Sequence, residues 1–346
     1  MTIILGIEST AHTFGVGIVK NEKILSNVKR TYTTEKGGII PLEAAKHHQQ
    51  NKNEIYFEAL EIANIKEKEI DAIAFSQGPG LAPCLLEGMS FAKELSKKLN
   101  KPLVPVNHCI AHLEIGKLTK ARDPVMLYAS GANTQIIAYE AGKYRIFGET
   151  LDIGVGNFID TFARYAGIGF PGGPAIEKLA LESKTYVELP YKVKGMDIAL
   201  SGILTNLKQK LESGSPRDDS SKDDSGEPSG EPKYKLEDLA YSMQETVFAM
   251  LVETAERALA HIGKKELLLG GGVACNSRLQ EMCKIMCKER GAKFFCPDKS
   301  LLVDNSAMIA FLGEIMFKFG IREDKLDKID IMPRQRTDDV EVSWKK

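Results

Sequence analysis

Apolar residues recur along the chain with two spacings, and the same order of spacings begins each half. Residues 3–8 and 15–19 are short apolar runs separated by the polar segment 9–13, a pattern typical of two strands of a β-hairpin. A third strand is predicted at 24–30. The chain is therefore expected to open with a small antiparallel sheet.

Helical and strand patterns alternate after this hairpin. Residues 41–65 carry apolar side chains at helical spacing, and 71–76 read as a buried strand that ends in a glycine-containing turn. A helix is predicted at 85–99, a short strand at 101–106, and a helical segment around His108. This order predicts a mixed α/β architecture.

The second half repeats the pattern of the first. Three strands are again predicted, and a polar turn at 130–134 joins the first two. An internal repeat of this kind predicts two related lobes, here 1–120 and 121–346, with a ligand bound between them. A C-terminal helix could pack back on the first lobe. The predicted elements of the second half are strands at 125–128, 135–139, 144–148 and 267–269, and helices at 157–165, 175–181, 236–262 and 277–290.

The composition limits the classes of function. The 346 residues carry a formal net charge of −1, so a nucleic acid would have to be held by a local patch or by a partner. No apolar run reaches the roughly 18–20 residues of a membrane span, and the first residues lead into a strand rather than a signal peptide. The six cysteines are irregularly spaced, which indicates reduced thiols. These features predict a cytoplasmic protein without a membrane partner.

One segment interrupts the α/β pattern. Residues 212–232 consist only of Ser, Gly, Pro, Asp, Glu, Lys and Arg. Such a segment has no apolar surface to bury and cannot offset the entropy of ordering. It is predicted to be a disordered surface insertion without a catalytic role.

Two histidines are the first candidates for chemistry. His108 and His112 are four residues apart, so on a helix they lie on one side and can share a metal ion. The same spacing also occurs on ordinary helix faces, but two oxygen ligands are available, Tyr128 at a strand end and Asp304 before the last helix, where it could also be the N-cap. Such an N₂O₂ set suits iron or zinc. Cys109 stands where a His-Glu-x-x-His protease has its glutamate.

Polar and glycine-rich turns are candidates for phosphate binding. The turns at 9–10 and 130–134 offer N–H groups and hydroxyls at the start of each half, which favours a clasp around phosphates over two ordinary turns. The glycine run 270–272 follows a strand and precedes a helix, which suits either an anion or a tight connection. Asp160 and Glu177 flank a Gly/Pro loop and could bind ribose hydroxyls or an amine, or be ordinary solvated residues.

Several segments together resemble one protein family. The chain is similar to the catalytic subunit of the KEOPS complex, the archaeal and eukaryotic tRNA threonylcarbamoyladenosine synthase, and to the bacterial and mitochondrial enzymes of the same group. The resemblance covers nearly the whole chain apart from 212–232. The segments that carry it are 75–80, 106–112, 148–153, 171–174, 194–202 and 304–310.

The resemblance implies a fold and a reaction. The fold is α/β with two related lobes of the actin/Hsp70/sugar-kinase (ASKHA) type around an interlobe nucleotide cleft. The reaction is transfer of the threonylcarbamoyl group from threonylcarbamoyl-AMP to N6 of adenosine 37, in tRNAs that read codons starting with A. A bound metal would hold the threonylcarbamoyl group or a phosphate oxygen while the amine attacks and AMP leaves, and the general base stays unassigned. The implied partners are tRNA, a small kinase-like protein and small adaptors.

The resemblance also implies site residues. Carried over by position, the ligands of one metal ion per subunit, iron (Fe²⁺) with zinc as the alternative, are His108, His112, Tyr128 and Asp304. Ala132 stands where the family usually has a second glycine, which is acceptable if its φ is negative or the phosphate leaves room for a methyl group. The implied adenylate surface consists of Tyr128, Ala129, Ser130, Gly131, Ala132, Asp160, Gly173, Glu177 and Asn276.

Three other functions compete with this interpretation. An ATP-dependent small-molecule kinase or ATPase of the same fold is the main alternative, although Glu8 stands where such kinases use aspartate for magnesium. A metallopeptidase is disfavoured by Cys109. A non-catalytic scaffold would be expected to have lost some of the four ligands, and this chain has them all.

Overall fold

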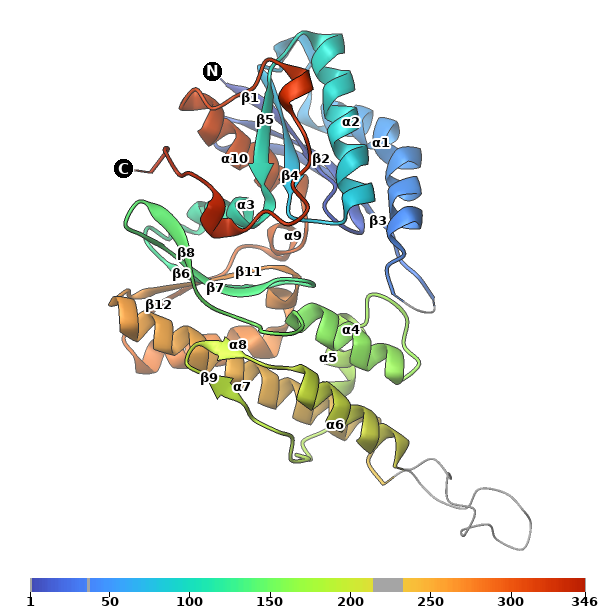
Figure 1. Ribbon diagram of the computed structural model, residues 1–346, viewed down its shortest axis with the longest axis vertical. Helices are drawn as coiled ribbons and strands as arrows, with labels where there is room; N and C mark the ends of the chain where they lie inside the picture. The colour runs from blue at the N-terminus through green and yellow to red at the C-terminus, as the bar shows by residue number, and fades with distance from the viewer. Residues whose placement is uncertain (1, 36–37, 214–232, 346) are drawn as a thin grey trace, which may run out of the picture.

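The fold is built on two five-stranded sheets, seen in a computed structural model that describes residues 2–35, 38–213 and 233–345 (Figure 1). The strands of the first sheet are β1 (Ile3–Glu8), β2 (Thr13–Lys20), β3 (Lys23–Thr31), β4 (Ala72–Gly78) and β5 (Leu103–Asn107). Their spatial order is β3-β2-β1-β4-β5, with β1, β2 and β3 antiparallel and β4 and β5 parallel to β1.

The second sheet repeats this topology. Its strands are β6 (Val125–Ala129), β7 (Thr134–Glu140), β8 (Lys143–Glu149), β11 (Glu266–Gly270) and β12 (Lys293–Phe295). Read from β8, the order is β8-β7-β6-β11-β12, again a three-stranded antiparallel unit followed by two parallel strands. The internal repeat predicted from the two hairpins is therefore confirmed. A separate two-stranded ribbon joins β9 (Val193–Lys194) and β10 (Asp197–Ile198).

Helices cover both faces of the first sheet. On one face α1 (Pro41–Ala63) packs on β2 and β3, and α2 (Ala82–Leu99) packs on β4. On the other face lie α3 (His108–Ile115) and α10 (Ser306–Lys318), and α10 contacts β1, β2, β4 and β5. The last long helix of the chain thus completes the first lobe.

The outer face of the second sheet is covered by the longest helix of the described chain. Helix α7 (Leu236–Ile262) packs against β6, β7, β8 and β11, and α8 (Ser277–Glu289) packs on α7 and β12. The remaining helices are α4 (Val155–Tyr165), α5 (Gly173–Leu181), α6 (Ser201–Glu212) and α9 (Lys299–Leu302).

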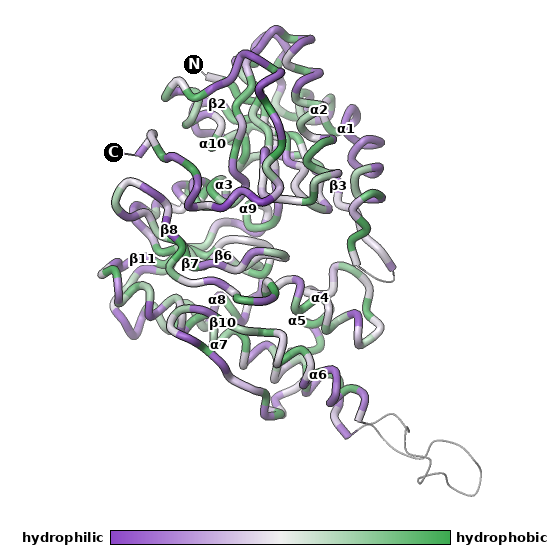
Figure 2. The backbone as a smooth tube through the Cα atoms, in the orientation of Figure 1, coloured by the Kyte–Doolittle hydropathy of each residue, from purple (hydrophilic) through white to green (hydrophobic). Residues whose placement is uncertain are grey.

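A shared apolar layer lies between the two sheets. Because side chains of a strand point alternately to opposite faces, Leu127 and Ala129 of β6 join the cluster of α7, whereas Met126 and Tyr128 join that of α3 and α10. Figure 2 shows the hydrophobic stretches concentrated in the strands and inner helices and the polar stretches on the periphery. Helix α3 therefore lies in the interior, where both lobes determine its position.

The structure corrects the predicted elements in a few places. Helix α6 and the two-stranded ribbon were not predicted, and α2 begins at Ala82 rather than at residue 85. The predicted insertion at 212–232 lies outside the described residues except for 212 and 213, where α6 ends. Within the described residues, no helix is long and apolar enough to cross a membrane.

Candidate functional site

Helix α3 presents two buried imidazoles from one face. Asn107 ends β5 and caps the helix, because its side-chain oxygen accepts a hydrogen bond from the N–H of Ile110 at 3.0 Å. The helix therefore starts at His108, and one turn later His112 lies beside it with 4.8 Å between ring centroids. Both rings are buried, at 5% and 2% exposure. The predicted pairing of the imidazoles is present.

Asp304 lies close to both imidazoles, just before α10. Asn305, not Asp304, is the N-cap of this helix, because its side chain accepts from the N–H of Met308 at 3.0 Å. The carboxylate of Asp304 is therefore not used to cap the helix. Its Oδ1 lies 3.4 Å from Nε2 of His108 and 3.7 Å from Nε2 of His112. The sequence left the N-cap role open, and the structure assigns it to the next residue.

The three donor atoms are arranged as metal ligands would be. The ligand atoms of His108, His112 and Asp304 all lie within 4.8 Å of one another. Donors about 2 Å from one tetrahedral ion are separated by about 3.3 Å, so only small shifts would bring them into coordination. Within the described residues, Nε2 of His112 is buried without a hydrogen-bond partner, which a metal ion would satisfy. The residues present fit a single metal ion.

The charges at the site favour the protonation state that a metal requires at His112 and Asp304, but they favour a proton on His108. Burial lowers the pKa of His112, which keeps that ring neutral. Burial alone would raise the pKa of Asp304, but the imidazoles of His108 and His112 close to its carboxylate hold that pKa well below its usual range. Burial alone would lower the pKa of His108, but the nearby carboxylates Glu8 and Asp304 raise it well above its ordinary value. A divalent cation would replace that imidazole proton.

Glu8 supports His108 from behind. It is fully buried at the end of β1, and its Oε2 lies 2.9 Å from Nδ1 of His108. Its other oxygen accepts from the N–H of Thr10 at 2.7 Å. A carboxylate on the second nitrogen fixes the orientation of a ligating imidazole and leaves Nε2 for the metal. Sequence reasoning missed this role, because 100 residues separate the two side chains.

Tyr128 lies beside the imidazoles. It is 1% exposed near the end of β6, and its ring centroid is 5.2 Å from that of His112. Burial raises the pKa of its phenol well above the ordinary value, so the phenolate would form only next to a cation.

The turn after β6 is exposed and pre-shaped. Ser130 closes it, since its N–H and its hydroxyl both donate to the carbonyl of Asn133, at 2.9 and 2.8 Å. Gly131 and Ala132 are exposed, and no protein acceptor is recorded for their N–H groups within the described residues. Ala132 does not have a positive φ, so an alanine is acceptable at this position of the turn in place of the family's glycine.

The first turn does not offer the phosphate donors that the sequence suggested. Ser9 and Thr10 are buried, and the N–H of Ser9 donates to the hydroxyl of Ser76 at 3.0 Å. The N–H and hydroxyl of Thr10 both donate to Glu8. These groups serve the support of His108, and the expected two-sided clasp is wrong on this side.

The other predicted nucleotide residues hold loops together. Asp160 accepts from the N–H of Gly172 at 2.8 Å, and burial raises its pKa. Glu177 accepts from the N–H and hydroxyl of Ser277. Asn276 caps α8 by accepting from two N–H groups. Gly173 starts α5, with open space where a side chain would begin.

Lys29 is a site residue that sequence reasoning missed. It projects from β3, and its Nζ donates to the carbonyl of Asp304 at 3.2 Å. Burial lowers its pKa, opposed by the nearby Asp304 and Glu8. Its strand position gave no signal, because the contact joins residues 275 positions apart.

Comparison with known sequences gives a consistent result. The family model described as tRNA N6-adenosine threonylcarbamoyltransferase (TsaD) matches residues 23–311. A protein of this name from Thermococcus kodakarensis is 54% identical over 342 residues, covering 99% of each chain. A probable bifunctional tRNA threonylcarbamoyladenosine biosynthesis protein from Methanosarcina mazei is 50% identical over 347 residues, and the match covers 99% of this chain and 60% of that protein.

Solved structures of low sequence identity share the fold. HypF from T. kodakarensis superposes with a TM-score of 0.58 at 14% identity, over 92% of this chain and 48% of the other. An activator of 2-hydroxyisocaproyl-CoA dehydratase from Clostridium difficile, solved with bound ADPNP, gives a TM-score of 0.50 at 12% identity, over 92% and 97% of the two chains. The fold is therefore of the two-lobed ASKHA type.

Proposed function

The chain belongs to the tRNA N6-adenosine threonylcarbamoyltransferase family, and from this premise we propose that it transfers a threonylcarbamoyl group from threonylcarbamoyl-AMP to N6 of adenosine 37 in tRNAs that read codons starting with A. The observation that carries the proposal is the match to a transferase at 54% identity over 342 residues, which covers 99% of each chain. The buried triad of His108, His112 and Asp304 supports it.

We propose that His108, His112 and Asp304, with Tyr128 as a fourth ligand, hold one metal ion. Two neutral imidazoles, a carboxylate and a phenolate suit iron, with zinc as the alternative. When bound, such an ion acts as a Lewis acid that polarises a carbonyl or phosphate oxygen of the adenylate. The chain's own part is to hold the ligand atoms in a water-poor layer, supported by the contact of Glu8 with His108.

We propose that the adenylate lies along the turn from Tyr128 to Ala132, with Ala129 at the end of β6. The exposed N–H groups of Gly131 and Ala132 are suited to a phosphate oxygen. Asp160 and Glu177 each use one carboxylate oxygen in the hydrogen bonds described above. The other oxygen of each could accept a hydrogen bond from a ribose hydroxyl, and Gly173 leaves room beside them. Asn276 has a spare amide hydrogen, since Nδ2 is recorded with one acceptor, Gln244.

Lys29 supplies positive charge beside the proposed metal. The donor, threonylcarbamoyl-AMP, carries a negatively charged phosphate and carboxylate. The acidic side chains of Glu8, Asp160 and Asp304 in this region would repel these groups. The half-buried ammonium of Lys29, next to Asp304, would attract either anion of the donor. We therefore assign Lys29 to binding of the donor.

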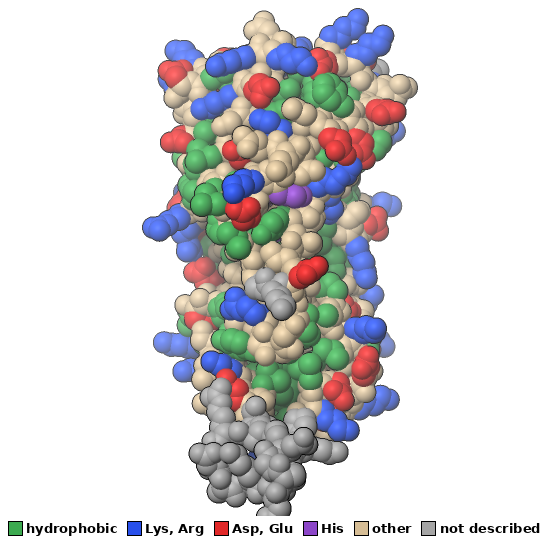
Figure 3. All heavy atoms as spheres, turned by 90° about the vertical axis from the view of Figure 1, so that its right-hand side faces the viewer, with side chains coloured by type: hydrophobic (Ala, Val, Ile, Leu, Met, Phe, Trp, Pro, Cys, Tyr) green, Lys and Arg blue, Asp and Glu red, His purple; other side chains and the backbone are tan. Residues whose placement is uncertain are grey.

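Binding of tRNA is proposed to depend on partner subunits, among them a small kinase-like protein and small adaptors. The formal net charge is −1, and Figure 3 shows a face on which basic and acidic side chains are interspersed. The bifunctional relative, of which this chain spans 60%, has by its name a second activity. This supports the proposal that a partner with another activity works together with this chain. A tRNA substrate supports the expected cytoplasmic location.

The kinase alternative has less support. In kinases of this fold the carboxylate after the first strand holds magnesium, but here the equivalent Glu8 is buried and bonded to His108 and Thr10. Family membership favours the transferase over the kinase.

The proposal is tested by assaying His108→Ala and His112→Ala. The purified chain is mixed with partner subunits, threonylcarbamoyl-AMP and an unmodified tRNA transcript, and the modified nucleoside is measured by mass spectrometry. Each variant should lose transfer by a factor of at least about 100, since removal of a metal ligand removes the metal. His261→Ala, an exposed histidine at the end of α7, is the matched control. Wild-type rates in both ligand variants would refute the assignment.

A further inference from the structure

The chain after α10 folds back along the first lobe. Residues 321–345, here called the C-terminal strap, begin beside β5, where Glu323 and Leu103 exchange two backbone hydrogen bonds of 2.8 and 3.0 Å. Further along, the carbonyl of Ile329 accepts from Nζ of Lys93 on α2 at 2.7 Å. The family model ends at residue 311, so the strap lies beyond the part of the chain that it matches.

The strap then reaches the N-terminal end of α3. The side-chain oxygen of Gln335 accepts a hydrogen bond from Nδ2 of Asn107 at 3.0 Å. Asn107 is also the N-cap of α3, through its other side-chain atom and the N–H of Ile110. The side-chain amide of Asn107 therefore does two things: its oxygen caps α3, and its nitrogen donates to the strap.

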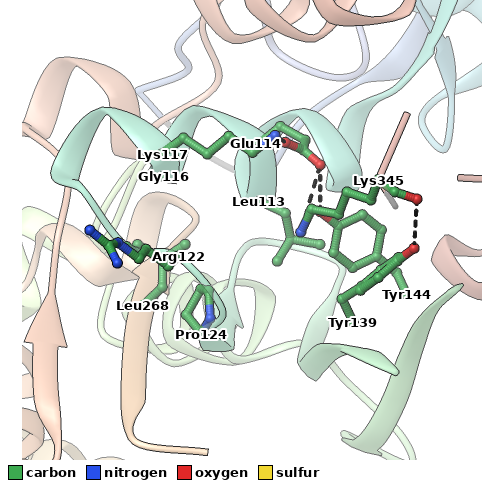
Figure 4. A pocket seen from close by; sticks show the side chains of 11 residues that line it. Leu113, Glu114, Gly116, Lys117, Arg122, Pro124, Tyr139, Tyr144, Leu268 and Lys345 are labelled. Atoms are coloured by element: carbon green, nitrogen blue, oxygen red, sulfur yellow. Dashed lines mark hydrogen bonds and ion pairs between the residues drawn. The ribbon is translucent and has the colours of Figure 1, made fainter. Parts of the chain in front are cut away.

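The end of the strap holds the C-terminal end of the same helix. Glu114 is fully buried on α3, and its Oε1 accepts from Nε1 of Trp344 at 3.0 Å and from the hydroxyl of Tyr144 at 2.5 Å. Figure 4 shows Lys345 and Tyr144 directed at this carboxylate, with the Nζ of Lys345 4.0 Å from Oε1. Glu114 follows His112 by two residues, about 200° around the helix, so it is held on the side away from the metal ligands.

Between these two ends the strap crosses to the second lobe. Arg336 lies 3.5 Å from Glu149 of β8, and the hydroxyl of Thr337 lies 3.4 Å from the side-chain oxygen of Gln135 on β7. Tyr139 donates to the carbonyl of Lys345 at 3.1 Å (Figure 4). The strap is thus fixed to the first lobe, to the second lobe and to both ends of α3.

Helix α3 depends on such contacts for its orientation. It has eight residues, and a helix of this length is not stable by itself. A displacement of about 1 Å is enough to spoil a metal site. We propose that the C-terminal strap is a positioning element of the metal site, and that the Trp344–Glu114 hydrogen bond holds α3 so that His108 and His112 stay aligned. This inference rests on the metal role given to these histidines under the proposed function.

The first test measures the affinity of full-length variants for Zn²⁺ by competition with a chromogenic chelator. Trp344→Phe keeps most of the aromatic surface and loses the indole donor. It should weaken Zn²⁺ binding by about tenfold, at the low end of the loss seen when outer-shell partners are removed. Tyr56→Phe is the matched control, because it also removes an aromatic donor to a glutamate (Glu67, 2.9 Å) but lies away from α3. It should bind Zn²⁺ like the wild type.

The second test uses the reciprocity of coupled equilibria. If the docked strap strengthens metal binding, saturating Zn²⁺ must favour docking by the same factor, so hydrogen exchange in peptides from 335–345 should slow by about tenfold. His108→Ala should show no such slowing. This measurement needs no strap variant, so it holds even if Trp344→Phe folds poorly.

The outcomes separate the two proposals. Unchanged Zn²⁺ affinity in His108→Ala would refute the metal site itself. Loss of Zn²⁺ binding in His108→Ala, together with equal affinities in Trp344→Phe and Tyr56→Phe, would refute the role of the strap alone. Exchange at 335–345 that is the same with and without Zn²⁺ would also overturn it.

Discussion

The carboxylate of Glu8 lies 2.9 Å from Nδ1 of His108 and is fully buried. At the sequence level this glutamate was notable only because it replaces the aspartate of kinases of the same fold. Its partner is 100 residues away, and no local pattern encodes such a contact. The pair His108 and His112 was predictable because helical spacing alone places two side chains together.

Glu8→Gln should lower metal affinity while leaving the fold intact. The amide can still accept a hydrogen bond from Nδ1 of His108, but the charge that supports the ligating ring is lost. The expected loss in Zn²⁺ affinity is about 10- to 100-fold, measured by chelator competition. Glu314→Gln, another fully buried glutamate, should keep the wild-type affinity. Equal affinities in the two variants would exclude a supporting role for Glu8.

His48 should make the stability of the protein depend on pH. Burial, followed by the charge of His47, lowers the pKa of His48 from 6.5 to about 4. The folded state therefore binds fewer protons than the unfolded state between these values, so its stabilising effect is complete above pH 6.5 and is lost as the pH falls toward 4. At about 1.4 kcal/mol per pKa unit, the whole effect is about 3 kcal/mol.

The variant His48→Gln tests this pH dependence. Glutamine does not titrate and can still donate to the carbonyl of Ala11, the partner of His48 at 3.0 Å. The fall in Tm between about pH 7 and about pH 4.5 should be smaller than in the wild type. His261→Gln, at an exposed site, should keep the wild-type slope. Parallel Tm profiles for all three proteins would contradict the prediction.

Elements were predictable where the apolar spacing is long and regular. Helix α7 was predicted at the residues where it is found, 236–262, because apolar residues recur at helical spacing along it, and ten of its fourteen buried side chains are apolar. Helix α6 was missed, since only Ile203 and Leu207 are buried in its twelve residues. The glycine run after β11 was recognised, but its function as a tight connection or an anion site stayed open in the sequence.

Within the glycine run, position 271 requires glycine for two separate reasons. Gly271 has a φ of +86°, and an added Cβ would lie 2.4 Å from the carbonyl oxygen of Ala129. Gly142 has a φ of +83° with nothing within 4 Å. Gly142→Ala should therefore cost about 1 kcal/mol for the backbone alone, and Gly271→Ala should cost at least about 2 kcal/mol more through the clash. Urea unfolding of both variants measures the difference, and equal losses would show that β6 yields to the methyl group.

At the scale of the molecule, the sequence predicted the repeat but not the layer that joins its copies. Each half opens with the same hairpin, so the two lobes follow from local patterns. In the C-terminal strap a regular apolar spacing is confined to Val340, Val342 and Trp344. The partners of the strap lie far away in the sequence, such as Glu114, which is 230 positions from Trp344. Its course could be found only from the folded chain.

A metal ion shared between distant segments should stabilise the whole molecule. The proposed ligands come from α3, β6 and the segment before α10, which lie on both lobes. Zn²⁺ at about a hundred times its Kd should add about 3 kcal/mol to the free energy of unfolding and raise Tm in differential scanning fluorimetry. His108→Ala should show no increase. A rise of the same size in that variant would place the stabilising metal elsewhere.

The position of α10 has a consequence for synthesis of the protein. This helix covers β1, β2 and β4 but is encoded about 230 to 300 residues after them. At ribosomal elongation rates, a nascent chain would therefore expose that apolar face for on the order of ten seconds or more. Cells that make this protein must keep the unfinished first lobe from aggregating until α10, which ends at Lys318, has been synthesised.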